Sequence, residues 1–288
     1  MLKQSILALC LAINLTTAAG AESPKAAWQE WTRTHDAELK NSLGSYLNVK
    51  EMIGVKAGET IYFAVSTPRA DAHWEKMPRG SQENVSLVFA DHKAVLTTSA
   101  QETVDLLTVP KWTAPDGIFV TAETAGDMLV ATLRDSTLPS IANFDKTPHF
   151  DYSAKAVGKA QLVRTGAPQP TQVGTTRGME RTLWRVATAR FTYDGHAAEL
   201  PVFTFNPGTG GAIEKHLFIP FTDATNGDKT YAGGRYVEAE LAVQTATHIT
   251  IDFNRAFNPL CARNHVFNCI KVPGKPLAFK LQAGELKP

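Results

Sequence analysis

Polar and charged side chains that could bind a ligand gather between residues 221 and 258 of this 288-residue sequence. A polar loop with an Asn-Gly turn leads through Gly233-Gly234 into a strand-like run, and the segment ends in "IDFNRAFNP". Guanidinium groups hold anions by paired hydrogen bonds, and carboxylates and amides orient bound molecules. We therefore expect a site for a small ligand, anionic ligands included. Its candidate residues are Asp223, Thr225, Tyr231, Arg235, Tyr236, Asp252, Asn254, Arg255 and Asn258.

Arg235 has two interpretations. In a strand that begins there, alternate apolar residues of 237–241 share one face, and Arg235 extends that row. An Arg at the end of a buried face needs a carboxylate partner, because an unpaired buried charge is costly. Asp223 and Asp252 are the nearest candidates in sequence. The pair could be a clamp that fixes a long loop to the sheet, or part of a pocket in which Arg235 or Arg255 holds an anionic ligand.

Two other classes of function stay open. A hydrolase would use Asp252 as general base, assisted by His248 or His265. The sequence contains no Gly-x-Ser-x-Gly, Ser-x-x-Lys or His-Glu-x-x-His motif, so no catalytic residue is assigned. A structural or partner-binding module is the third class. Asp223, Thr225 and Asp228 could offer oxygen atoms to Ca²⁺, but the glycine is misplaced for an EF-hand loop, and we expect no metal or other cofactor.

Two cysteines near the C-terminus, Cys261 and Cys269, are separated by a short loop that contains His265. In an oxidising compartment such a pair is first interpreted as a disulfide. A metal site formed with His265 is the alternative, but structural zinc usually takes four ligands and prolines bracket the segment. We predict the disulfide.

The elements that must position these residues are mainly strands. A cap at Ser23, a proline at 24 and an apolar row through Trp28, Trp31, His35 and Leu39 predict a helix over 24–42. From residue 60 onward short apolar runs alternate with turn residues, and an Asp194-Gly195 pair predicts a hairpin. The expected strands are Ile61–Ser66, Val85–Ala90, Ala94–Thr98, Thr103–Thr108, Ile118–Ala122, Met128–Leu133, Gln161–Arg164, Leu183–Tyr193, Ala198–Phe205, His216–Phe221, Arg235–Val243, His248–Phe253 and Pro276–Gln282.

Helical periodicity is absent between these strands, which argues against parallel winding. We expect a mainly β protein: an antiparallel sandwich or barrel-like body with an N-terminal α-helix. The residues 147–159 are the best place for a boundary between two β lobes, because they combine Pro148 and Gly158 with little apolar pattern.

The first 21 residues have the features of a removable signal peptide: Lys3, an apolar run too short to cross a bilayer, and Ala19-Gly20-Ala21 at the end. Cys10 lies inside the apolar run and follows a bulky Leu9, so we do not expect a lipoprotein. The expected location is the periplasm or the exterior, with no transmembrane segment. The net charge is only +1, and scattered Lys and Arg residues predict no nucleic-acid partner. The sequence does not indicate the oligomeric state.

The motifs "TYAGGRY" and "IDFNRAFNPLC", the second cysteine and the final Ala283-Gly284-Glu285 resemble the bacterial family called domain of unknown function 1684. The resemblance extends to Trp31, to Gly44 with Leu47, and to the run 57–59, so it implies one family domain over 22–288. The sequence departs from the family pattern after Cys269 and at Phe257, where a Tyr is common. The family carries no assigned activity.

Overall fold

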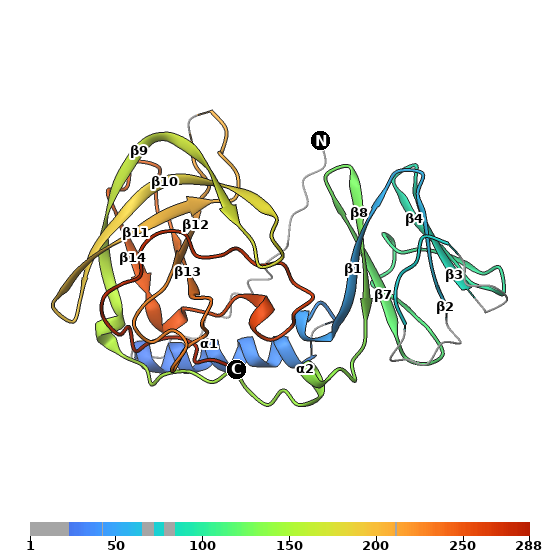
Figure 1. Cartoon of the computed structure of the whole chain (residues 1–288), viewed down its shortest axis with the longest axis horizontal. Coiled ribbons are helices and arrows are strands. Elements are labelled where there is room, and N and C mark those ends of the chain that lie inside the picture. The colour runs from blue at the N-terminus through green and yellow to red at the C-terminus, as the bar shows by residue number, and fades with distance from the viewer. Residues whose placement is uncertain (1–22, 42, 65–71, 78–83, 211) are drawn as a thin grey trace, which may run out of the picture.

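The computed structural model describes residues 23–41, 43–64, 72–77, 84–210 and 212–288. The expected signal peptide over 1–21, Cys10 included, lies outside the described residues. The described part is mainly β, with antiparallel sheets and an N-terminal helix, as predicted (Figure 1). No helix in it has the length and apolar character that crossing a membrane would require.

Helix α1, Pro24–Asn41, begins where the sequence signals predict. The hydroxyl of Ser23 accepts a hydrogen bond from the Ala26 N–H at 3.2 Å and so caps the first turn. The Trp28 indole donates to the Asn254 carbonyl oxygen at 3.1 Å, and Leu39 is buried. The apolar row of α1 therefore packs on the β body.

Two four-stranded antiparallel sheets follow, and we call them the N-terminal sandwich. A turn, η1 (Tyr46–Asn48), leads into β1 of the first sheet. Both sheets contribute to one apolar core, in which Val55, Leu87, Leu96 and Leu129 have no exposed surface. The first sheet has the order β1 (Val49–Lys56), β8 (Met128–Arg134), β7 (Phe119–Ala125), β6 (Trp112–Thr113); the second has β2 (Thr60–Ala64), β3 (Asn84–Ala90), β4 (Lys93–Thr97), β5 (Thr103–Asp105).

A segment with two short helices, α2 (Pro139–Ala142) and η3 (Ala154–Ala156), carries the chain to a six-stranded antiparallel sheet. This sheet curls into a nearly closed barrel, which we call the C-terminal barrel (Figure 1). Its order is β13 (Arg235–Glu240), β12 (His216–Phe221), β11 (His196–Thr204), β10 (Glu180–Tyr193), β9 (Val157–Gly174), β14 (His248–Asp252). At one end an isolated antiparallel bridge between Tyr236 and Phe257 joins β13 to the segment that follows β14.

Beyond β14 the chain makes two further turns, η4 (Phe253–Arg255) and η5 (Leu260–Ala262), and no strand is recorded among the described residues that follow. The expected strand Pro276–Gln282 is therefore wrong. Its apolar residues Leu277 and Leu281 are buried at the barrel, but its backbone bonds run to a loop: the Leu277 N–H to the Thr222 oxygen, and the Ala224 N–H to the Phe279 oxygen. The alternation of apolar residues reflects the burial of Leu277 and Leu281 against the barrel, and not hydrogen bonding of this segment to a neighbouring strand.

The Asp-Gly hairpin prediction is confirmed. Tyr193 pairs with His196, and the two turn residues, Asp194 and Gly195, both have positive φ, 46° and 84°. This is the backbone that a two-residue hairpin requires, and it explains the residue types at the turn.

Candidate functional site

Arg235 is fully buried and its guanidinium acts as a clamp. One terminal nitrogen, Nη2, donates to the Asp223 carboxylate at 2.7 Å and to the Leu281 carbonyl oxygen at 3.0 Å. The other, Nη1, donates to the carbonyl oxygens of Ala283 and Glu285. The Phe221 ring lies 5.2 Å from the guanidinium carbon. Arg235 thus ties the C-terminal segment of the chain to the start of β13.

Asp223 completes this clamp. Its other carboxylate oxygen accepts from the Thr225 N–H at 2.7 Å and from the Leu281 N–H at 3.3 Å. Burial lowers the pKa of Arg235, and the neighbouring Asp223 opposes that change. Neither side chain has exposed surface. The geometry is that of the clamp interpretation, and it leaves no side-chain surface of this pair for a ligand.

Gly234, at the entry to β13, has a steric reason to be glycine. Its φ is +92°, and a Cβ there would lie 2.8 Å from the Phe221 carbonyl oxygen and 2.5 Å from a Val272 methyl. The glycine allows the backbone to approach its own chain closely at the foot of the clamp.

Asn254 and Asn258, two more candidates, also hold chain segments together. The Asn254 amide exchanges hydrogen bonds with the backbone of Ser153, at 2.9 and 3.0 Å. The Asn258 amide donates to the Leu286 oxygen at 2.8 Å, and its N–H donates to the Glu285 carboxylate at 2.9 Å. Burial raises the pKa of Glu285 to about 7. These contacts fix the connecting segment and the C-terminus to the barrel.

The remaining candidates lie in other places. Thr225 is buried and its hydroxyl contacts the Thr230 hydroxyl at 2.8 Å. The Tyr236 hydroxyl donates to the Ile270 carbonyl oxygen, and burial raises the pKa of Tyr236. Tyr231 lines a pocket beside Cys261 and Cys269.

Asp252 and Arg255 line an open groove of about 460 Å³ between β13 and β14. The Asp252 carboxylate accepts from the Asn254 N–H at 3.0 Å and so caps η4, while Arg255 lies 5.2 Å above the Trp31 ring. The predicted site is thus divided among the clamp, this groove and the cysteine pocket.

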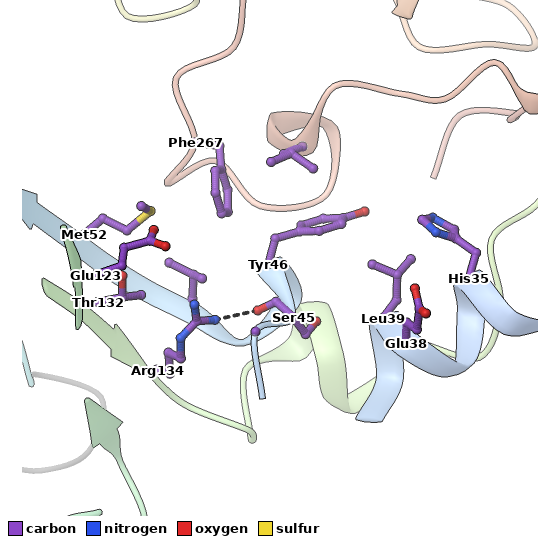
Figure 2. A pocket seen from close by; sticks show the side chains of 13 residues that line it. His35, Glu38, Leu39, Ser45, Tyr46, Met52, Glu123, Thr132, Arg134 and Phe267 are labelled. Carbon is purple, nitrogen blue, oxygen red and sulfur yellow. Dashed lines mark hydrogen bonds between the residues drawn. The ribbon is translucent and has the colours of Figure 1, made fainter. Parts of the chain in front are cut away.

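A different pocket, of about 410 Å³, lies between the N-terminal sandwich, α1 and the loop after β14 (Figure 2). We call it the junction pocket. Segments far apart in sequence form it, and none of the predicted site residues is among them. The lining residues are His35, Glu38, Leu39, Gly44, Ser45, Tyr46, Val49, Met52, Glu123, Thr132, Arg134, Leu260 and Phe267.

The sandwich side of the junction pocket is the outer face of the first sheet. In the register of this sheet Met52 lies opposite Thr132, and Val49 lies opposite Arg134. The side chains alternate, so that Leu129, Ala131 and Leu133 of β8 enter the sandwich core while Thr132 and Arg134 face the pocket. A register shift between Val49 and Glu51 keeps Val49 on the pocket side.

Arg134 supplies the positive charge of the junction pocket. Its Nη1 donates to the Ser45 carbonyl oxygen and to the Asn48 amide oxygen, both at 2.8 Å, and its Nε donates to the Thr121 hydroxyl at 3.0 Å. Among the described residues, no hydrogen bond from Nη2 is recorded. Burial lowers the pKa of Arg134, and the nearby Glu123 opposes this change. Arg134 is thus held in place mainly by neutral oxygens, and one nitrogen can serve a ligand.

Aromatic and apolar side chains form the other walls. Tyr46 and Phe267 meet edge to face with ring centroids 6.0 Å apart, and Figure 2 shows them above the sheet residues. Burial raises the pKa of Tyr46 to about 12, so its hydroxyl stays neutral near pH 7. Met52 and Leu260 remain 40% and 37% exposed, although they are large apolar side chains. The pocket therefore combines open apolar surface with one held cation, Arg134, and the exposed carboxylates of Glu38 and Glu123.

No group of three or more His, Cys, Asp or Glu residues in the described ranges is arranged to hold a metal ion.

Comparison with known proteins identifies the family of this chain. A family model described as a protein of unknown function, DUF1684, matches residues 142–286, half of the chain. The chain belongs to the DUF1684 family.

The part of this DUF1684 protein that matches the family model includes the barrel, the clamp and the loop of Leu260 and Phe267. The resemblance predicted for residues before 142 stays a prediction. A solution NMR structure of an uncharacterized Haloarcula marismortui protein is 31% identical, with 50% of this chain and 78% of that chain covered and a TM-score of 0.42. No curated protein matches this chain.

Proposed function

We propose that this DUF1684 protein binds a small amphipathic molecule, with an apolar body and an anionic group, in the junction pocket. The observation that carries the proposal is Arg134, which is held at the edge of an apolar cavity without a buried carboxylate partner. Arg235, by contrast, has no exposed surface, and the hydrogen bonds of its two terminal nitrogens all run to Asp223 and to backbone oxygens of the protein's own chain.

The size and composition of the junction pocket support this proposal. Sites for small molecules typically enclose about 300–1,000 Å³ and combine apolar walls with a few polar groups. The volume of about 410 Å³ lies in that range, and Tyr46, Phe267, Met52 and Leu260 supply the apolar walls. Arg134 would bind the anionic group of the ligand, and the Thr132 hydroxyl lies beside it.

A hydrolase centred on Asp252 has less support. Its carboxylate accepts the hydrogen bonds that cap η4, and the His248 ring contacts the neighbouring Thr247 hydroxyl at 3.0 Å. A general base would need its carboxylate or imidazole directed at a substrate. The second Asp252 oxygen lies 3.7 Å from the Arg255 Nε, so its ion-pair partner is an arginine and not a histidine that could assist it.

The test of ligand binding uses anilinonaphthalene sulfonate, a fluorescent probe with an apolar body and an anionic group. Met52→Glu places a negative charge in the junction pocket, and we expect it to weaken probe binding about tenfold or more. Met179→Glu is the matched control, because Met179 is also exposed and lies outside the pocket. Fluorescence titration measures both variants, with circular dichroism to verify folding. Equal binding by both variants would contradict the site.

We also propose that the protein is exported to the periplasm or the exterior and that residues 1–21 are removed. The support is the sequence pattern alone. An oxidising compartment is also where Cys261 and Cys269 would form a disulfide. N-terminal sequencing of protein from fractionated cells tests export: a chain that starts at Glu22 in the envelope or medium is expected, and an uncleaved cytoplasmic chain would exclude it.

A further inference from the structure

The loop between Cys261 and Cys269 brings its two ends together. The Cys261 N–H donates to the Cys269 sulfur at 3.1 Å, and both residues are thiols in the structure. Cys269 is buried and Cys261 is half-buried. The Cys269 end is held to the barrel, because its N–H donates to the Thr176 hydroxyl at 3.1 Å and its carbonyl oxygen accepts from the Thr176 N–H.

A pocket of about 330 Å³ opens on this pair. Tyr231, Thr176 and Lys271 contribute to its lining, together with both cysteines. A small disulfide compound can therefore approach the half-buried Cys261 from the pocket.

The residues inside this loop contact the other half of the molecule. The Asn264 amide donates to the carbonyl oxygens of Tyr46 and Val49, at 2.9 and 2.7 Å. Arg263 lies 5.5 Å above the Phe144 ring, and Phe267 packs on Tyr46. The same loop thus forms one wall of the junction pocket and ties the barrel to the sandwich.

We propose that Cys261 and Cys269 are a thiol–disulfide exchange site whose oxidation latches this loop and so stabilises the wall of the junction pocket. The oxidant is a small-molecule disulfide, such as oxidised glutathione. The exchange itself does not depend on the proposed ligand function; only its effect on the pocket rests on that function.

The exchange proceeds in two steps. Cys261, as a thiolate, attacks one sulfur of the disulfide; a Cys261 mixed disulfide forms, and the other thiolate leaves and takes up the released proton. Cys269 then loses its proton and attacks the Cys261 sulfur, which releases the second thiol. The two cysteines lose two electrons in total, and the oxidant gains them as two thiols.

The environment supports these roles. The hydrogen bond from Cys269 lowers the pKa of Cys261 to about 6, while the contact with Cys261, followed by burial, raises the pKa of Cys269. The more exposed sulfur is therefore also the better nucleophile near pH 7.

Peptide mapping of the protein treated with oxidised glutathione tests disulfide formation. Trypsin cleaves after Arg255, Arg263 and Lys271, so each cysteine lies in its own peptide, 256–263 or 264–271. We expect these two peptides to be joined under non-reducing conditions and separate after reduction. If the two peptides remain separate after the reaction with oxidised glutathione is complete, the proposal is wrong.

Single variants test the order of the steps. Cys269→Ser should accumulate glutathione on Cys261, because the second thiol is absent, whereas Cys261→Ser should react about tenfold more slowly or not at all. Mass spectrometry of peptides 256–263 and 264–271 follows both reactions. Equal rates at the two positions would contradict Cys261 as the preferred attacking thiol.

Hydrogen exchange of the amides of 262–268 tests the latch in the wild-type protein. We expect slower exchange in the oxidised form than in the reduced form, and tighter binding of anilinonaphthalene sulfonate. A joined pair with unchanged exchange would overturn the latch. Slower exchange with no probe binding in either form would support the latch while contradicting the proposed ligand function.

Discussion

Arg235 and Arg134 both lie at an end of a strand, yet their surroundings differ. Arg235 is fully buried, faces an equally buried Asp223, and donates its remaining hydrogen bonds to carbonyl oxygens of the C-terminal segment. Arg134 is held by neutral oxygens at the wall of a cavity, and Glu123, the carboxylate that acts on its charge, is an exposed residue. A buried charge that is enclosed with its counter-ion holds a fold together, because losing either partner is costly, whereas a held charge with open surface beside it can bind a ligand.

The largest expected effect comes from breaking the clamp. Arg235→Met leaves Asp223 buried without its partner, and losing one member of a buried ion pair costs about 3–5 kcal/mol. We expect the free energy of unfolding, measured by urea denaturation, to fall by that amount. The matched comparison is Arg190→Met, because Arg190 forms an exposed ion pair with Glu199. A similar small loss in both variants would contradict the clamp.

The next effect concerns Glu285, whose backbone oxygen Arg235 contacts. Its folded pKa is about 7 against an ordinary value of 4.5, so the folded state binds the proton more tightly. The contribution of Glu285 to the free energy of unfolding is therefore fully present below pH 4.5 and is lost as the pH rises to about 7. At about 1.36 kcal/mol per pKa unit the loss is about 3 kcal/mol.

Glu285→Gln should remove this loss, because the amide cannot ionise and its oxygen can still accept from the Asn258 N–H. We expect the variant to be more stable than the wild type at pH 8 and close to it at pH 4.5. Thermal unfolding across this range measures the difference. His35 and His149, whose pKa values burial lowers, add a pH dependence of opposite sign that cancels in the comparison. If the difference in stability between the variant and the wild type stayed the same across this pH range, the pH dependence could not be assigned to Glu285.

Arg134→Met should have a smaller effect on stability and a larger one on binding. The loss of charged hydrogen bonds to Ser45, Asn48 and Thr121 costs about 2 kcal/mol at this half-buried position. Binding of anilinonaphthalene sulfonate should fall about tenfold or more, because its anionic group loses its cation. Titration of folded Arg134→Met checks this, and unchanged affinity would remove Arg134 from the proposed site.

The smallest expected effect is on the rim of the same pocket. Glu123→Gln removes a negative charge that competes with an anionic ligand for Arg134, and the residue is exposed, so stability should change by less than about 0.5 kcal/mol. We expect probe affinity to increase a few-fold at low salt, with a smaller increase at high salt. Weaker or unchanged probe binding would contradict the competition between Glu123 and the anionic group of the probe for Arg134.

Much of the fold could be predicted because its signals are local. The Ser23 cap with Pro24 predicted the start of α1, and the Asp194-Gly195 pair predicted the β10–β11 hairpin. The expected strand Pro276–Gln282 failed for the same reason: alternation reports which side chains are buried, but not whether the backbone finds a strand partner.

The sequence by itself determined the fold class, the helix and the need of Arg235 for a carboxylate, because periodicity, turn geometry and the cost of a buried charge act on near neighbours. Only the tertiary structure decided that Asp223 is that carboxylate and that the resulting pair is sealed from solvent. It also decided the junction pocket, where residues as distant as His35, Arg134 and Phe267 meet. No local pattern marks such a pocket, because the packing of whole elements brings its walls together.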